Sequence, residues 1–504
     1  MMTVLVPSPR LLTTAVAALT AVTLVGCSVG PNFRRPAAPV VDSYTRPSLT
    51  GTTASADVAG GAAQRLVPGQ DIPDDWWTLL QSPGLNTLVE RALRANPTLV
   101  AAERALHQAS ELVAAQRGLF YPTVQGSFSP SYQRTSSTLA PPLSTNQLTY
   151  SLYTAQVSVG FTPDVFGGNR RQVESLLGQA EAQRFQLAAT YVTLTSNVVA
   201  AAVQEASLRA QLAATREIIS ISTGSLELVR RQFQFGAVAG LEVAAQETAL
   251  AQVEQTLPAL QKQLEQNRNL LTALAGGLAS DDPEEQFDLA SFQLPTDLPV
   301  SVPAKLVEQR PDVRAAEAQL HAASAQIGVA VASRLPQFTI TGALGGTSTN
   351  IATMFANSHP FWSIAGNVAQ SIFDGGTLLH RQRAAEAAFE QAAAQYRSTV
   401  ITSFQNVADV LYALQADAES LRAAVAAERA AKRTLDITLR QQEFGAASYL
   451  ALLSARQAYQ QALITRVQAQ ANRLADTAAL FQALGGGWWN RPSAARTTGQ
   501  AAER

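Results

Sequence analysis

Four short segments of the chain alternate between apolar and polar residues, which is the period of a β-strand with one apolar face. They cover residues 122–133, 151–161, 337–346 and 362–372. In the first segment, Val124, Phe128 and Tyr132 are separated by Gln, Gly, Ser and Pro. Each segment has about the length of a tilted strand that crosses a membrane. The pattern predicts four membrane strands, although two hairpins on a soluble β-sandwich would alternate in the same way.

Two much longer stretches predict helices that no compact domain could contain. Residues 377–444 include neither Gly nor Pro, and residues 169–235 include only Gly178 and Gly224. Ala, Gln, Glu, Leu and Arg dominate both stretches and favour helix. At 1.5 Å per residue each helix is roughly 100 Å long. Polar residues on several faces and poor Leu/Ile heptads favour the wall of a tube over an exposed two-stranded coiled coil.

The second half of the chain repeats the first. AAERALHQAS at 101–110 corresponds to AAEAQLHAAS at 315–324, and RQFQFG at 231–236 corresponds to RQQEFG at 440–445. Each half predicts a first helix (about 85–117 and 304–333), a hairpin, a very long helix, a short turn and a second helix. The predicted boundaries are a first repeat at 72–276, a linker at 277–302, a second repeat at 303–489 and a flexible tail at 490–504.

Four strands are too few to close a membrane barrel, and an open sheet edge would leave backbone groups unpaired in lipid. Closed outer-membrane barrels have about eight strands or more. Two chains would give eight strands around a filled interior, and three would give twelve strands around an opening. The sequence therefore predicts a mainly α-helical chain with duplicated halves, whose four strands contribute to a membrane β-barrel shared between chains.

The N-terminus has the pattern of a processed leader. Arg10 is followed by LLTTAVAALTAVTLVG and then by Cys27, the only cysteine. This apolar run is shorter than a membrane-spanning helix requires. Its end, LVGC, resembles a bacterial lipobox, which implies cleavage before Cys27 and acylation of its thiol and new amine. We predict a signal peptide at 1–26 and a lipidated tether at 27–71; an uncleaved anchor with an incidental cysteine is the alternative.

Composition argues against several other functions. Lys and Arg number 37 against 38 Asp and Glu, so charge provides no reason to expect a nucleic-acid partner. A single cysteine excludes cysteine zinc sites and iron–sulfur clusters. His107 and His321 occupy equivalent repeat positions, which indicates packing or capping. No catalytic motif is present, and the glycines at 167–168 and 375–376 predict strand-to-helix turns. We expect no enzyme activity, no metal site and no cofactor beyond the covalent lipid.

An ordered set of motifs resembles the TolC-type outer-membrane efflux proteins, and in particular their NodT-like lipoprotein branch. The motifs are the lipobox followed by GPNFRRP at 30–36, FDGG at 373–376, FQNVAD at 404–409 and ALGGGW at 483–488. The resemblance implies a homotrimer with a twelve-stranded outer-membrane barrel and a long periplasmic α-helical barrel. It also implies a periplasmic adaptor and an inner-membrane pump, commonly of the RND class, as partners. Ser28 after Cys27 favours sorting to the outer membrane of a Gram-negative cell, where the protein would contact outer-membrane lipid with its helical body in the periplasm.

The same resemblance implies roles for the two helical turns. Gly236, Leu241 and Gly445 would lie at the periplasmic tip and face the adaptor, and Leu450 and Ser454 would line the closed aperture. Many relatives have an aspartate where Ser454 stands, so a carboxylate ring is not expected here and Leu450 would form an apolar constriction.

The expected function is the exit duct of a tripartite efflux system for small molecules such as drugs or metabolites. One alternative is the outlet of a type I protein-secretion system. Another is a lipid-anchored periplasmic coiled-coil spacer without a pore, which would need no lipid-facing hairpins.

Overall fold

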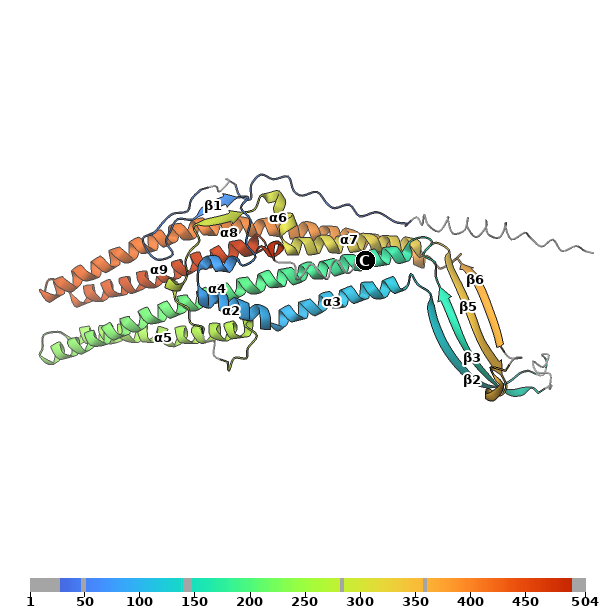
Figure 1. Ribbon diagram of the computed structural model, residues 1–504. Coiled ribbons are helices and arrows are strands. Elements are labelled where there is room, and N and C mark those ends of the chain that lie inside the picture. Colours follow the sequence, from blue (N-terminus) through green and yellow to red (C-terminus); the bar gives the residue numbers. More distant parts are fainter. Residues whose placement is uncertain are drawn as a thin grey trace, which may run out of the picture. The chain divides into compact units, whose positions relative to one another are not determined.

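The computed structural model describes residues 28–46, 51–136, 138, 147–281, 285–356 and 360–491. The predicted signal peptide, Cys27 and residues 492–504 of the predicted tail lie outside the described residues. The described chain divides into two units, which we treat separately (Figure 1). Unit 1 contains residues 28–35, 107–182 and 316–396, and unit 2 contains residues 36–106, 183–315 and 397–491.

Unit 1 contains a four-stranded antiparallel sheet in the order β2-β3-β5-β6. Its strands lie within three residues of the expected ends: β2 is Thr123–Arg134, β3 is Thr149–Phe161, β5 is Gln337–Ser348 and β6 is Pro360–Ala369. Each hairpin arises from one half of the chain, and the halves join where β3 pairs with β5.

The strand registers bring the apolar positions of all four strands to one face of the sheet. Val124 pairs with Val159, and Leu344 pairs with both Val157 and Trp362. These side chains are exposed in the single chain, with Val124 at 66 % and Trp362 at 75 % of their full accessibility. An apolar face of this size requires lipid or another protein surface to cover it.

The helices repeat their lengths in the two halves of the chain. The pairs are α3 (Pro97–Gly118) and α7 (Pro311–Ala332) with 22 residues each, α4 (Gly168–Gln234) and α8 (Thr377–Glu443) with 67, and α5 (Gly240–Leu274) and α9 (Tyr449–Ala483) with 35. Each half therefore has the same order of helix, hairpin, long helix and returning helix.

The first helix of each half is broken by proline, so the expectation of one continuous helix was wrong. The structure has α2 (Pro83–Ala95) before α3 and α6 (Pro303–Gln309) before α7. Asn96 and Arg310, which precede the prolines, have extended backbone with ψ of 120° and 122°. A proline disfavours the helical conformation of the residue before it and cannot donate a helical hydrogen bond.

The main core of unit 2 lies where the helices of both halves meet the chain segments around them. Trp76 is fully buried and stacks on Phe481 of α9 at a ring-centroid distance of 5.0 Å. Two short strands, β1 (Arg65–Pro68) and β4 (Asp297–Val300), pair in parallel beside it. The pairing of β1 with β4 joins the segment before the first repeat to the linker between the repeats.

Part of the predicted tether is held firmly against α9 in unit 2. Arg473 is completely buried, and its Nη2 donates to the carbonyl of Ala62 at 2.6 Å and to Thr53 Oγ1 at 3.1 Å. Gln64 donates to Thr477 Oγ1 at 3.1 Å. A buried guanidinium needs several acceptors, and here the N-terminal segment supplies them.

Asp417 of α8 lies near Asp476 and Arg473 of α9. Burial, together with the hydrogen bond and charge of Asp476, raises the pKa of Asp417 to about 7, against the attraction of Arg473. The unfolded chain ionises such a carboxyl near about pH 4. The stability contributed by Asp417 is therefore fully present below about pH 4 and is lost as the pH rises to about 7.

Asp417→Asn is expected to raise the unfolding temperature at about pH 8 and to give no comparable gain at about pH 4. The asparagine is neutral at both values, and the gain should be on the order of 1–2 kcal/mol because the carboxyl is partly solvated. Thermal unfolding followed by circular dichroism in detergent measures this. A larger gain in acid than in base would contradict the raised pKa.

Candidate functional site

The two turns between the long helices of unit 2 have the same backbone design. Gly236 follows α4 with φ of 72°, and Gly445 follows α8 with φ of 70°. In both turns the glycine N–H and the next N–H donate to carbonyls of the preceding helix. A residue with left-handed backbone conformation at this position ends the helix, and glycine adopts that conformation without steric cost. The turns therefore lie at Gly236 and Gly445, where the sequence analysis placed them.

Large apolar side chains project into solvent at both turns. Leu241 is 78 % exposed and Leu450 is 68 % exposed, while Phe235 and Phe444 exceed both at 87 % and 86 %. The sequence analysis missed the two phenylalanines, although each directly precedes the turn glycine in the repeated RQ-x-x-FG motif. Exposed apolar groups clustered at one place mark a surface that contacts another molecule.

A polar contact joins α9 to α4 near these turns. The Arg456 guanidinium donates a hydrogen bond to Ser225 Oγ, and the Tyr449 hydroxyl donates to the Ser225 carbonyl at 3.5 Å. Burial lowers the pKa of Arg456 and raises that of Tyr449. Ser454 is exposed, one turn beyond Leu450 on the same side of α9. Arg456, Tyr449 and Ser225 are thus a link between the two helix pairs that spacing alone did not reveal.

The strand-to-helix junctions of unit 1 are fixed by an aspartate in each half. Asp164 accepts hydrogen bonds from the backbone N–H groups of Asn169 and Arg170, both at 2.9 Å. Asp374 accepts from Gly376 and Leu378 at 2.8 and 2.9 Å. A carboxylate that caps the first N–H groups of a helix also favours its dipole. These junctions start α4 and α8 at equivalent positions.

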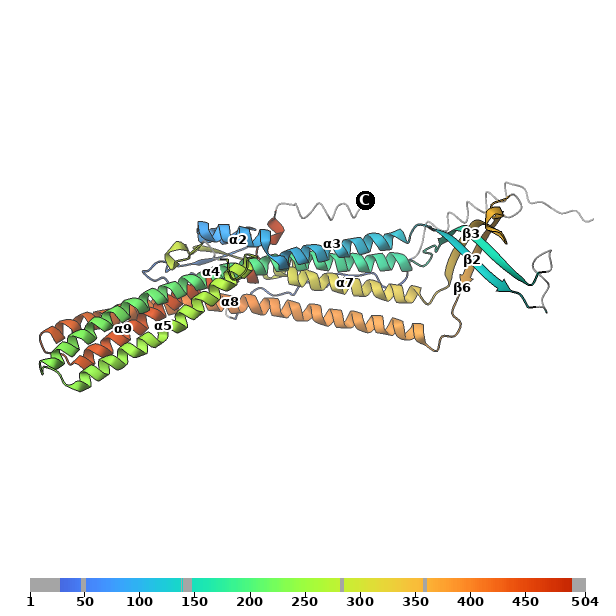
Figure 2. The ribbon, with the colours of Figure 1, turned by 90° about the horizontal axis from the view of Figure 1, so that it is seen from below.

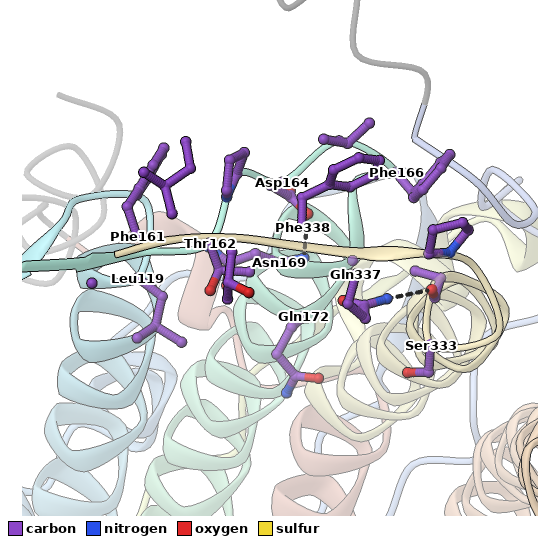
Figure 3. A pocket seen from close by; sticks show the side chains of 18 of the residues that line it. Leu119, Phe161, Thr162, Asp164, Phe166, Asn169, Gln172, Ser333, Gln337 and Phe338 are labelled. Carbon is purple, nitrogen blue, oxygen red and sulfur yellow. Dashed lines mark hydrogen bonds between the residues drawn. The ribbon is translucent and has the colours of Figure 1, made fainter. Parts of the chain in front are cut away.

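A cavity of about 590 Å³ lies beside the first of these junctions (Figure 3). Leu119 and Phe161 contribute apolar surface, whereas Gln172 of α4 and Ser333 contribute polar groups. Gln337 also lines the cavity and donates to the Ala332 carbonyl at 3.1 Å. Its mixed lining suits the boundary between strands with an exposed apolar face and helices with polar surfaces.

The segment directly after Cys27 is docked in unit 1. Val29 donates its N–H to the carbonyl of Phe166 at 3.2 Å, and Arg171 donates to the Val29 carbonyl at 3.0 Å and to Asn32 Oδ1 at 2.8 Å. Gly30 passes so close to Gly328 of α7 that a Cβ on Gly30 would lie 2.4 Å from the Gly328 Cα. Residues 29–32 therefore follow a defined path along unit 1.

The two equivalent histidines have different surroundings. His321 stacks on Phe33 with ring centroids 4.5 Å apart, and its Nε2 lies 3.0 Å from Glu174 Oε1. His107 is exposed, with its Nδ1 3.7 Å from Glu111. His321 thus has the packing role that the repeat predicted, and His107 does not. Within the described ranges, no group of three or more His, Cys, Asp or Glu side chains is arranged to hold a metal ion.

The chain combines a four-stranded sheet that has an exposed apolar face with paired long helices, and its sequence matches a known protein family. The family described as outer membrane efflux protein matches the chain at residues 88–277 and 302–486.

The chain belongs to the outer membrane efflux protein family.

Individual relatives align with this efflux protein over most of its length. The pyoverdine export outer membrane protein OpmQ of Pseudomonas putida is 28 % identical over 441 residues, which are 87 % of this chain and 93 % of OpmQ. The toluene efflux pump outer membrane protein TtgC of Pseudomonas putida is 28 % identical over 492 residues, 96 % of each chain. The structure of the outer-membrane channel OprN matches with a TM-score of 0.80 at 25 % identity, covering 92 % of this chain and 100 % of OprN.

The predictions of a TolC-type family and of efflux through an outer-membrane channel are confirmed. This efflux protein acts in the outer membrane. Among the described residues one helix, α4, is long and apolar enough to cross a membrane, but 56 % of its most apolar window is buried inside the chain. Packing against other helices therefore accounts for the apolar composition of α4.

Proposed function

We propose that three copies of this efflux protein share one twelve-stranded barrel in the outer membrane and one α-helical tunnel in the periplasm. Through this duct a periplasmic adaptor and an inner-membrane pump of the RND class would pass small molecules out of the cell. The observation that carries the proposal is the four-stranded sheet of unit 1, which has two open edges and an exposed apolar face.

The open edges support association of the chains. β2 and β6 are the outer strands of the sheet, with 12 and 10 residues. Their outward backbone groups would be unpaired in lipid, where each unsatisfied group costs several kcal/mol. Pairing β6 of one copy with β2 of the next satisfies both edges. Three copies close a ring wide enough for an opening, whereas two close one that side chains fill.

The exposed residues at the two turns support a partner at the periplasmic tip. Phe235, Leu241, Phe444 and Leu450 form an apolar surface that a periplasmic adaptor would cover. The names of the two relatives described above mention different substrates, pyoverdine and toluene. This difference supports a general duct whose substrate the pump selects. The exposed sheet argues against a periplasmic spacer without a pore.

Multi-angle light scattering of the detergent-solubilised protein, corrected for bound detergent, is expected to give the mass of three chains. The reason is the count of four strands per chain and the two unpaired edges. A monomer that still forms pores in lipid bilayers would contradict the shared barrel. A stable dimer would contradict the twelve-stranded count while leaving the principle of sharing intact.

The proposed anchor is a set of acyl chains on Cys27. Its support is the lipobox-like LVGC ending at the only cysteine, together with the docked path of the residues that follow. Several acyl chains anchor a protein stably, because each buried CH₂ adds about 0.8 kcal/mol.

Cys27→Ala is expected to leave the leader uncleaved and the protein without acyl mass. Intact-mass spectrometry of protein from native membranes measures both changes. The barrel by itself holds the variant in the membrane, so localisation is not the readout. Ser28→Ala is the matched control and should keep the lipid. A Cys27→Ala protein with normal processing and the same lipid mass would overturn the assignment.

A further inference from the structure

The long helices of unit 2 lie side by side, with α5 and α8 at the two edges of the group (Figure 1). α5 contacts α4 through Asn267, which donates to the Ala201 carbonyl at 2.8 Å. α4 contacts α9 through Ser225 and Arg456, and α9 contacts α8 through Arg466 and Glu428 at 2.7 Å. In Figure 1 the helices follow one another in the order α5, α4, α9, α8, with α5 and α8 outermost, and α5 also approaches α9 (Figure 2). When copies close into a tube, α8 of one copy meets α5 of the next.

The edge formed by α8 has a stripe of positive charge. Arg422, Arg429 and Arg433 are exposed and separated by seven and four residues, which returns each to nearly the same face at 100° per residue. They border a groove of about 410 Å³, which is also lined by Ala426 and Ala430 of α8 and by residues 55–57 of the N-terminal segment.

One carboxylate of the same chain already touches this stripe. Asp57 Oδ2 lies 2.7 Å from the Arg429 guanidinium, and its side chain is 92 % exposed. Within the described residues, Arg422 and Arg433 have no carboxylate partner in their own chain. The stripe thus retains positive charge that no carboxylate of the described residues neutralises at Arg422 and Arg433.

The opposite edge, α5, has a matching stripe of negative charge. Glu247, Glu254 and Glu265 are exposed, and their spacings of seven and eleven residues place them on one face. That face lies beside the side of α5 that packs on α4, where Gln246 and Asn267 make their contacts. Glu247 also pairs with Arg230 of α4 at 2.7 Å, and both side chains are about half exposed.

The two stripes lie at the same level, counted from the turns. Arg429 is 14 residues before the end of α8 at Glu443, and Glu254 is 14 residues after the start of α5 at Gly240. α8 runs toward its turn and α5 runs away from its turn. Residues that are equally many positions from the two turns therefore lie at the same level along the helices. Arg433 and Glu247 differ in level by three residues and Arg422 and Glu265 by four, about 5–6 Å along the axis, which these long side chains bridge.

A pair of opposite polarity agrees with this register. Glu419 of α8 lies 24 residues before Glu443, and Lys262 of α5 lies 22 residues after Gly240. Both are exposed. A negative charge on the mainly positive edge therefore meets a positive charge on the mainly negative edge. Any register shifted by a full turn or more would weaken this match.

We infer that α8 of one copy docks on α5 of a second copy of this chain through a ladder of ion pairs centred on Arg429 and Glu254. The inference rests on the proposed assembly of several copies and adds which helices meet, in which register and by which charges. Complementary stripes of this kind fix the register between chains more than they add affinity, because an ill-matched register brings like charges together.

The first test is chemical cross-linking of the full-length protein in detergent. Arg429→Cys combined with Glu254→Cys is treated with a short bismaleimide and separated by denaturing electrophoresis. We expect most chains to become a covalent trimer, because each copy links to the next around a closed ring. The matched control is Arg429→Cys with Gln252→Cys. Gln252 is exposed and lies two residues from Glu254, hence about 200° around the helix. The single-cysteine variants give the background, because they show any linking that does not need both introduced cysteines.

The outcomes separate the inference from the proposed trimer. Strong linking of 429 with 254 and weak linking of 429 with 252 supports the ladder. Equal linking of both pairs, or no linking in a protein that light scattering shows to be trimeric, overturns the ladder and leaves the trimer. A monomer in light scattering overturns both.

The second test uses charge reversal. Arg429→Glu and Glu254→Arg should each lower the temperature at which the trimer dissociates in detergent, because each brings like charges together. The double variant should restore most of that loss and should form the same trimer. A double variant no more stable than the less stable single variant would overturn the pairing of these two residues.

Discussion

Replacing Arg456 by alanine is expected to raise the resting conductance of the channel in planar lipid bilayers. The guanidinium of Arg456 holds the first turns of α9 to Ser225 of α4, in a partly buried place where water competes poorly for the bond. A hydrogen bond to a charged group contributes about 1.5–3 kcal/mol. Loss of a bond that only the closed state makes shifts the equilibrium between closed and open channels toward the open state by about ten- to a hundredfold.

Three variants make this experiment specific. Ser225→Ala removes the hydroxyl partner and should reproduce part of the effect. Arg456→Lys keeps the charge but loses the planar fork and should lie between the wild type and Arg456→Ala. Arg216→Ala changes an exposed arginine of α4 and should leave the conductance unchanged. If Arg456→Ala conducts like the wild type while remaining trimeric, the link does not hold the channel shut.

Leu450→Ala is also expected to raise resting conductance, because the closed tunnel needs side chains that converge at the tip. Leu450 is 68 % exposed in the single chain, so it is available to meet its copies in a trimer. A ring of three leucines excludes water from a narrow passage, and alanine widens and wets it. Ser454→Asp adds three carboxylates one turn away and should make conductance sensitive to divalent cations, since like charges in a narrow ring attract counter-ions.

Leu241→Ala is the matched control, because Leu241 is equally apolar and 78 % exposed at the other turn. It is assigned to the adaptor-facing surface and should leave the conductance of the isolated channel unchanged. If Leu450→Ala has no effect while Leu241→Ala opens the channel, the aperture belongs to the first turn. The duplicated architecture would stand in either case.

Much of the local structure follows from the sequence, because it depends on neighbouring residues. The alternation at Val124, Phe128 and Tyr132 reports the two-residue period of a strand, and each strand was placed within three residues of its ends. The glycines at 236 and 445 mark helix ends, because few other residues adopt a positive φ. The breaks at Pro97 and Pro311 were equally local, but helix-favouring composition on both sides concealed them in the pattern.

Features that join distant parts of the chain were decided only by the tertiary structure. Arg456 and Ser225 are separated by 231 residues, and Arg473 and Ala62 by 411. Neither pair leaves a mark in local periodicity, because each depends on which helices lie together and at what level. Alternation likewise predicted an apolar face for each strand, but the registers placed Val157, Leu344 and Trp362 on one common face. The sequence by itself determined the elements, their order and the family. Their lateral contacts required the fold, because the free energy of a contact depends on burial and distance, which neighbouring residues do not specify.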